Sequence, residues 1–151
     1  MQSLTGWNRW VWSSWSLTDA TSIFYLTGIW VDAGERLVAL YLSRHRDCCF
    51  FVNNSSTCRR TRELRLCVSP TRIRILRMLA GCTDSTRPLG WTKILPARFL
   101  LPLMSMGCGA EYVNASICVD ETRAFKDEEE CQAMRLASAI NDKAMERFKA
   151  L

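Results

Sequence analysis

The chain has 151 residues, of which 48% are hydrophobic and 23% are charged, and its formal net charge is +5. This composition excludes a wholly disordered protein, because the chain has enough apolar surface to build a core. The length suits one domain and is too short for two, so we predict a single domain over residues 1–151.

Residues 1–21 form a tryptophan-rich N-terminal segment, with Trp7, Trp10, Trp12 and Trp15 among serines and threonines. We expect these rings to pack against the domain. They also suit peripheral contact with a membrane, since an indole has an apolar body and a polar edge. The segment has neither the uninterrupted apolar run nor the cleavage site of a secretory signal. We therefore expect an intracellular protein, without a transmembrane segment.

Residues 22–68 are rich in β-branched and aromatic side chains that are interrupted by short polar breaks. This pattern is typical of strands joined by turns. A turn at 32–35 predicts a hairpin between the two strands that flank it. The four predicted strands cover 23–31, 36–42, 48–52 and 63–68. Because their connections are short, we predict an antiparallel meander.

Residues 69–151 are predicted to be mainly helical. Ser69 before Pro70 is typical of a helix start, and Gly81 is typical of a helix end. The apolar residues between them share one face at 100° per residue, with arginines on the other side. These apolar residues are Ile73, Ile75, Leu76, Leu79 and Ala80. The run 89–106 is strongly apolar, but Pro96 and Pro102 exclude one unbroken helix there.

The C-terminal segment has the clearest helical pattern of the chain. Asp127 and Glu130 have the spacing of a capping box. The apolar residues that follow recur at steps of three and four: Ala133, Leu136, Ala137, Ile140, Ala144, Phe148 and Leu151. The sequence thus predicts an α+β fold in which a small antiparallel sheet of about four strands precedes helices and a long C-terminal amphipathic helix.

The segment 59–81 holds most of the candidate binding residues. Arginine outnumbers lysine sixteen to four in the whole chain, and the planar guanidinium suits bidentate contact with carboxylates and phosphates. The candidate partner- or phosphate-binding residues are Arg59, Arg60, Arg62, Arg65, Arg72, Arg74 and Arg77. We predict a basic, non-enzymatic protein-interaction module. It binds an acidic partner through this arginine-rich face, or it binds a partner through the C-terminal helix. A nucleic-acid-binding protein that contacts phosphates through the same arginines is the alternative.

One local resemblance supports the alternative. The run SPTRIRILRMLA, residues 69–80, resembles the helix that opens the winged helix-turn-helix of ArsR-type bacterial repressors. The run LGWT, residues 89–92, together with Arg98, Leu100 and Gly107, is similar to the turn and recognition helix of that family. The resemblance implies that Thr92, Lys93 and Arg98 contact bases or phosphates. Pro96 and Pro102 depart from the family pattern, because prolines break the helix that should enter the groove.

The sequence predicts no catalytic residue, metal site, cofactor or small-molecule substrate. The eight cysteines include no C-x-x-C pair, and His45 is the only histidine. We therefore expect buried free thiols. The common nucleotide, metalloprotease and hydrolase motifs are missing, so we lean against an enzyme. A chain rich in Arg, Ser, Cys and Trp is also typical of a recently arisen or lightly selected reading frame without a defined activity.

Overall fold

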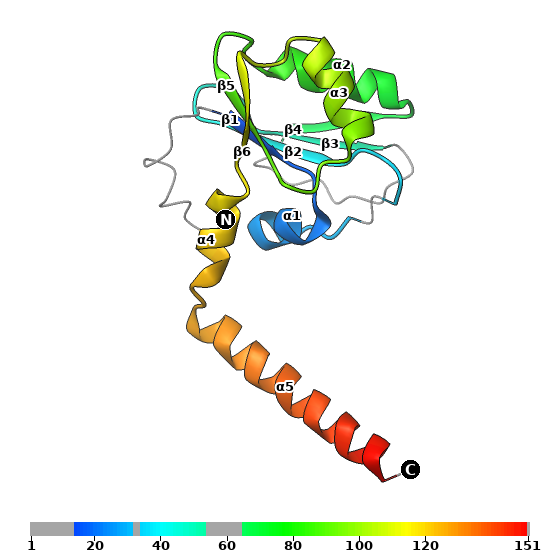
Figure 1. Cartoon of the computed structure of the whole chain (residues 1–151), viewed down its shortest axis with the longest axis vertical. Coiled ribbons are helices and arrows are strands. Elements are labelled where there is room, and N and C mark those ends of the chain that lie inside the picture. The colour runs from blue at the N-terminus through cyan, green and yellow to red at the C-terminus, as the bar shows by residue number, and fades with distance from the viewer. Residues whose placement is uncertain (1–13, 32–33, 54–64, 151) are drawn as a thin grey trace. The chain divides into compact units, whose positions relative to one another are not determined.

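The computed structural model describes residues 14–31, 34–53 and 65–150. These residues form six strands and five helices (Figure 1). The strands are β1 (Ser14–Leu17), β2 (Ala39–Ser43), β3 (Cys49–Asn53), β4 (Arg65–Ser69), β5 (Pro88–Trp91) and β6 (Glu111–Asn114). The helices are α1 (Ala20–Thr27), α2 (Arg72–Cys82), α3 (Ala97–Ser105), α4 (Ile117–Ala124) and α5 (Glu128–Lys149).

All six strands join one mixed sheet in the order β4-β3-β2-β1-β5-β6. The pairs β1 with β2 and β2 with β3 are antiparallel. The pairs β3 with β4, β1 with β5, and β5 with β6 are parallel. The α+β class and the long C-terminal helix are therefore confirmed. The sheet differs from the predicted meander in two respects: it has six strands, and the pairs at both of its edges are parallel. Both differences arise because segments far apart in the chain lie side by side.

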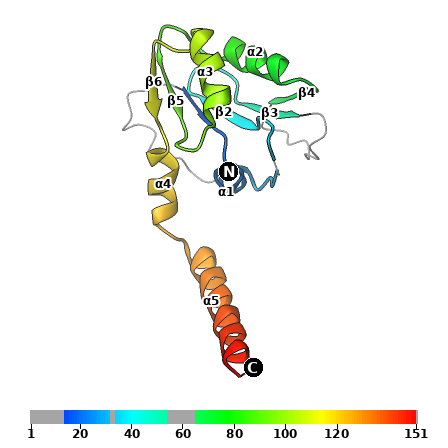
Figure 2. The same cartoon turned by 45° about the vertical axis from the view of Figure 1, so that its right-hand side comes forward.

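The sheet has a hydrophobic core on each face, because buried side chains alternate along its central strands. Tyr41 and Phe51 belong to the core that α2 and α3 cover, and Leu40 and Phe50 belong to the core on the α1 side. Figures 1 and 2 show α2 and α3 on one side of the sheet and α1 on the other. A strand with both faces buried lacks the polar alternation of a surface strand, which explains the continuous apolar runs in β2 and β3.

Helix α1 occupies residues that the sequence pattern assigned to a strand. Its start is fixed by Asp19, whose carboxylate accepts a hydrogen bond from the Ser22 amide at 2.6 Å. Its end is fixed by Gly28, which adopts the left-handed conformation at φ 69°. Ile23 and Leu26, three residues apart, are buried on one side of the helix. The two caps and this spacing outweigh the strand propensity of the sequence.

Helix α2 confirms the helix predicted after Pro70, with two differences. Its N-cap is Thr71 rather than Ser69, and Gly81 lies within the last turn instead of ending the helix. Ile75 is buried against the sheet, whereas the side chain of Ile73 is 60% exposed. The buried stripe is therefore narrower than the apolar pattern predicted.

The apolar run 89–106 divides at its first proline. Its beginning forms the buried strand β5, and α3 starts directly after Pro96, which is the N-cap. Pro102 lies inside α3. The run is thus not a single helix, as predicted, but only Pro96 lies at a helix boundary, because α3 continues through Pro102. The segment matched to the turn of a winged helix is instead a strand between β1 and β6.

The chain divides into two compact units, residues 1–119 and 120–151. The second unit is dominated by α5, whose N-terminus carries the predicted capping box. The carboxylate of Asp127 accepts from the Glu130 amide at 2.8 Å, and the carboxylate of Glu130 accepts from the Asp127 amide at 3.0 Å. The single domain over 1–151 stays a prediction. Among the described residues, no helix is both long and apolar enough to cross a membrane.

Candidate functional site

The predicted arginine surface is described only in part. Arg59, Arg60 and Arg62 lie outside the described residues, as do Trp7, Trp10 and Trp12. The other four candidate arginines are all exposed, on the edge strand β4 and on the outer side of α2: Arg65, Arg72, Arg74 and Arg77. A binding role for these arginines stays a prediction.

The residues implied by the winged-helix resemblance make contacts within the chain. Thr92 is buried at the end of β5, where its hydroxyl lies 3.0 Å from the hydroxyl of Thr18. The amide of Lys93 donates to the hydroxyl of Ser116 at 2.6 Å. The guanidinium of Arg98 donates to the carbonyl of Glu35 and lies over the ring of Phe99, 4.9 Å from its centre. Because these contacts belong to the sheet and its loops, the winged helix-turn-helix interpretation is wrong.

One end of the sheet carries four residues that we call together the threonine end: Thr18, Thr92, Lys93 and Ser116. They follow β1, β5 and β6, which are mutually parallel and end together. Open α/β sheets generally bind ligands beyond the carboxyl ends of their parallel strands. Here the two threonine hydroxyls bond to each other, and the backbone amide of Ser116 donates a hydrogen bond to Oδ1 of Asn114 at 3.1 Å. The arrangement holds the three strand ends together.

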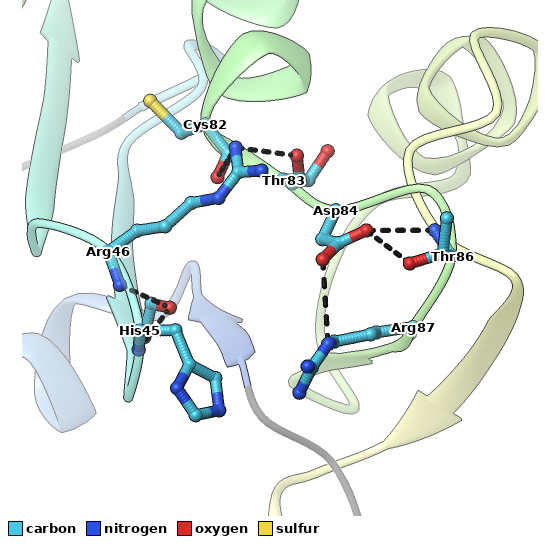
Figure 3. Close-up of polar contacts among 8 residues, drawn as sticks. His45, Arg46, Cys82, Thr83, Asp84, Thr86 and Arg87 are labelled. Atoms are coloured by element: carbon cyan, nitrogen blue, oxygen red, sulfur yellow. Dashed lines mark hydrogen bonds and ion pairs between the residues drawn. The ribbon is translucent and has the colours of Figure 1, made fainter.

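A second polar group lies at the opposite end, where α2 passes into β5 (Figure 3). Arg46, on the turn between β2 and β3, donates through Nη1 to the carbonyls of Cys82 at 3.4 Å and Thr83 at 3.1 Å. The turn is closed by Ser43, whose hydroxyl accepts from the amides of His45 and Arg46, both at 3.2 Å. Arg46 therefore links two turns that are far apart in the chain, since Arg46 and Thr83 are 37 residues apart.

Asp84 organises the turn that follows α2. Its carboxylate accepts from the hydroxyl of Thr86 at 2.6 Å and from the Thr86 amide at 3.0 Å, and it pairs with Nε of Arg87 at 3.5 Å (Figure 3). The hydrogen bonds from Thr86, followed by the charges of Arg46 and Arg87, hold the pKa of Asp84 below its usual value. Asp84 is thus an ionised turn residue.

Three thiols meet behind this turn, and we call this group with Arg46 and Asp84 the thiol end. Cys82 closes α2, and its sulfur lies 3.9 Å from the sulfur of Cys49 on β3. Cys67 on β4 faces the same core and interacts with Cys49. Burial, with the neighbouring Cys82, raises the pKa of Cys49 to about 12. Burial also raises the pKa of Cys67, so both thiols stay protonated at neutral pH.

His45 does not complete a nucleophile or a metal site with these thiols. It is exposed on the turn between β2 and β3, and Figure 3 shows its ring apart from the sulfur of Cys82. Among the described residues, no three His, Cys, Asp or Glu side chains are grouped so that they could hold a metal ion. Cys49, Cys67 and Cys82 are free thiols. The thiol end can therefore support thiol chemistry, in which two neighbouring sulfurs react.

Comparisons with known proteins bear on the fold. No family model and no curated protein matches the sequence. Solved structures do match. A prolidase from Thermococcus sibiricus aligns over 98% of this chain and 42% of its own, with a TM-score of 0.76 and 18% identity. A dipeptidase from Pyrococcus horikoshii OT3 aligns over 98% and 42%, with a TM-score of 0.74 and 22% identity.

A third structure is an isolated domain. It is the creatinase/prolidase N-terminal domain of an X-Pro dipeptidase from Streptococcus pyogenes, which aligns over 78% of this chain and 93% of its own, with a TM-score of 0.59 and 14% identity. The chain has the fold of a prolidase N-terminal domain. It spans about two-fifths of the length of the longer prolidase and dipeptidase chains that it matches.

These matches overturn the predicted function. We predicted a basic, non-enzymatic protein-binding module, with nucleic-acid binding as the alternative, but the structures that share this fold are prolidases and dipeptidases. The physical reason for the error is that charge alone was taken as a binding signal. In the structure, the segment 65–82 builds an edge strand and a covering helix, whose apolar residues pack on the sheet while the arginines face outward.

The contacts at the thiol end were missed because they join residues far apart in the chain. Cys49 and Cys82 are 33 residues apart, and neither lies in a short cysteine motif. The sequence Asp84-Ser85-Thr86 is a turn signal of its own, since an aspartate often bonds the backbone two residues on. That signal marked a loop, but it did not indicate which strand the loop would meet.

Proposed function

We propose that this chain is the N-terminal domain of a prolidase-type dipeptidase, an enzyme that hydrolyses dipeptides with proline in the second position. One observation carries the proposal. The chain aligns over 98% of its residues with about two-fifths of longer prolidases and dipeptidases, and it covers 93% of a separately solved N-terminal domain of an X-Pro dipeptidase. The size and the fold of the chain thus correspond to one recognised domain of that enzyme class.

The proposal assigns hydrolysis to a part of the enzyme beyond the matched two-fifths. This division agrees with the chemistry of the described residues. The buried thiols Cys49 and Cys67 are protonated at neutral pH, and His45 is exposed on a turn. A protonated, buried thiol is a poor nucleophile. In this proposal the sheet and the helices packed on it serve as a structural scaffold within the N-terminal domain of the dipeptidase.

We also propose an intracellular location, as the sequence predicted. The free thiols of Cys49 and Cys82, whose sulfurs are 3.9 Å apart, support this, because a reducing compartment keeps neighbouring cysteines in the thiol form.

The experiment is an activity assay on the native protein. An antibody raised against the purified chain is used to isolate the native protein from its cells, and mass spectrometry establishes that the isolate contains this chain. The isolate is then incubated with Ala-Pro and with Leu-Pro, and released proline is measured. Ala-Leu serves as the matched substrate without proline. We expect release of proline from both X-Pro dipeptides at a rate well above that of Ala-Leu hydrolysis.

The control is the extract from which the antibody has removed the chain. A loss of X-Pro hydrolysis from this extract, in proportion to the chain removed, assigns the activity to the native protein. If the isolate contains the chain but releases no proline, while an active prolidase in the same buffer does, the proposal is wrong. The recombinant chain alone is expected to release none.

A further inference from the structure

The three thiols of the thiol end are brought together by three different elements. Cys49 begins β3, Cys67 lies in β4, and Cys82 is the last residue of α2. Because α2 follows β4 directly and packs back on β3 and β4, its end returns to the beginning of β3. This places the sulfur of Cys82 at 3.9 Å from that of Cys49, which is van der Waals contact between two thiols.

We propose that Cys49 and Cys82 form a reversible disulfide when the protein meets hydrogen peroxide. A disulfide joins two sulfurs at about 2.05 Å. The sulfurs must therefore approach by a little less than 2 Å from the observed 3.9 Å, a distance that side-chain rotation with a small shift of the helix end supplies. Cys82 is well placed for such a shift, because α2 ends at this residue and the backbone becomes extended at Thr83.

The two cysteines have different access to solvent, and this assigns them different roles. Cys82 is partly exposed, whereas the side chain of Cys49 is 1% exposed. Hydrogen peroxide therefore reaches Cys82 first. The sulfur of Cys82 attacks one oxygen of the peroxide, the O–O bond breaks, and a sulfenic acid and one water result. Cys49 is the resolving thiol.

In the second step the sulfur of Cys49 attacks the sulfur of Cys82. The S–S bond forms, the S–O bond of the sulfenic acid breaks, and the hydroxyl leaves as water with the proton of Cys49. Two thiols and one peroxide thus give one disulfide and two waters, and the two electrons lost by the sulfurs reduce the peroxide. The raised pKa of Cys49 makes its thiol slow toward peroxide, which agrees with Cys82 reacting first. The second step depends on the contact between the two sulfurs, which holds Cys49 against the sulfenic acid while its proton passes to the leaving hydroxyl.

Cys67 is the competing partner for Cys49, and strand geometry disfavours it. Cys49 pairs with Arg65 across the parallel ladder, and Cys67 is two residues further along β4, opposite Phe51. Neighbouring strands are roughly 4.8 Å apart and two residues rise roughly 6.6 Å, so the Cα atoms of Cys49 and Cys67 are roughly 8 Å apart. That separation exceeds the limit of about 7 Å for a disulfide.

The bond would fasten the end of α2 to the sheet. Arg46 already links the β2 to β3 turn to the carbonyls of Cys82 and Thr83 by hydrogen bonds. A disulfide beside these contacts would add a covalent bond between the end of α2 and β3, where hydrogen bonds from Arg46 already hold the end of the helix. Because it closes a long loop of the chain, we expect it to raise the melting temperature by about 10 °C.

The test uses the recombinant chain, dilute enough to avoid links between molecules, before and after treatment with hydrogen peroxide. Trypsin leaves Cys49 in the peptide 47–59, Cys82 in the peptide 78–93 and Cys67 in the peptide 66–72. Without reductant, we expect peptides 47–59 and 78–93 to appear as one linked species, lighter by two hydrogens than their sum. Dithiothreitol should separate them again.

Variants identify the cysteines, because the peptide 47–59 also holds Cys48 and Cys58. We expect Cys49→Ser and Cys82→Ser to lose both the linked species and the rise in melting temperature. Cys48→Ser, Cys58→Ser and Cys67→Ser are the matched controls and should keep both. A link that survives in Cys49→Ser, a link from 47–59 to 66–72, or no link in peroxide-treated chain that is still folded would each overturn the proposal.

Discussion

The packing of α2 on the sheet can be tested with two substitutions on the same helix. Leu79 is fully buried in the core between α2, α3 and the sheet, whereas the side chain of Ile73 is 60% exposed. Leu79→Ala removes three buried carbon atoms, which at about 0.8 kcal/mol each amounts to about 2.4 kcal/mol of lost transfer free energy. The cavity left behind adds to this, so we expect a total loss of about 3 to 4 kcal/mol.

Ile73→Ala is the matched control, because the apolar pattern of the sequence placed Ile73 on the same face as Leu79. In the structure it removes little buried surface, and alanine has the higher helix propensity. We therefore expect a change in the free energy of unfolding of about 0.5 kcal/mol or less. A large loss of stability for Leu79→Ala beside a small change for Ile73→Ala would show that the buried face of α2 is the one observed, and not the wider face that the sequence predicts.

The assay is urea unfolding followed by tryptophan fluorescence. All six tryptophans lie in the unit formed by residues 1–119, so the signal reports on the sheet and not on α5. With an m-value of about 2 kcal/mol/M, Leu79→Ala should lower the unfolding midpoint by about 1.5 to 2 M urea. Equal losses for Ile73→Ala and Leu79→Ala, or a loss below about 1 kcal/mol for Leu79→Ala, would refute the described packing.

Three further predictions concern a pair of glycines, the turn residue Asp84 and the helix cap Asp127. In Gly109→Ala the new Cβ would lie 2.8 Å from Cβ of Leu89, so we expect a loss of about 1 to 3 kcal/mol in the same urea assay. Gly81→Ala, where no atom lies within 4 Å and the residue is helical, should be neutral or stabilise by up to about 1 kcal/mol; equal losses at both glycines would contradict the described contact. The lowered pKa of Asp84 means that its contribution to stability is present above its unfolded pKa and is lost as the pH falls through the lower folded pKa. The melting temperature of the wild type should therefore fall more between about pH 5 and about pH 3 than that of Asp84→Asn, and identical falls would exclude the effect. Asp127→Ala should destabilise the start of α5 by about 1 kcal/mol and speed amide exchange at Glu130, whereas Asp127→Ser should retain slow exchange; equally fast exchange in both variants would count against the hydroxyl as a substitute cap.

The parts of the fold that the sequence predicted are those that depend on local signals. The capping box of Asp127 and Glu130 requires only residues within one turn, and it is present as predicted. The strand around Cys49 and the helix after Pro70 also follow from patterns of fewer than fifteen residues. Hydrophobic periodicity and turn residues are sufficient for such elements.

The parts that could not be predicted depend on contacts between distant segments. The pairing of β1 with β5 joins residues more than seventy positions apart, as Ser14 opposite Leu89 shows. In α1, the aromatic and β-branched residues favoured a strand, but burial of Ile23 and Leu26 on one side of a capped helix prevailed. The contact between Cys49 and Cys82 depends on the same return of α2 to the sheet, so no local spacing of cysteines could indicate it.

The most direct measurement of the central proposal is the release of proline from Ala-Pro by the native protein that contains this chain. We predict that the isolated native protein releases proline, and that removal of the chain from a cell extract removes this activity in proportion. A native isolate that contains the chain and leaves Ala-Pro intact, beside an active prolidase control, would contradict the account.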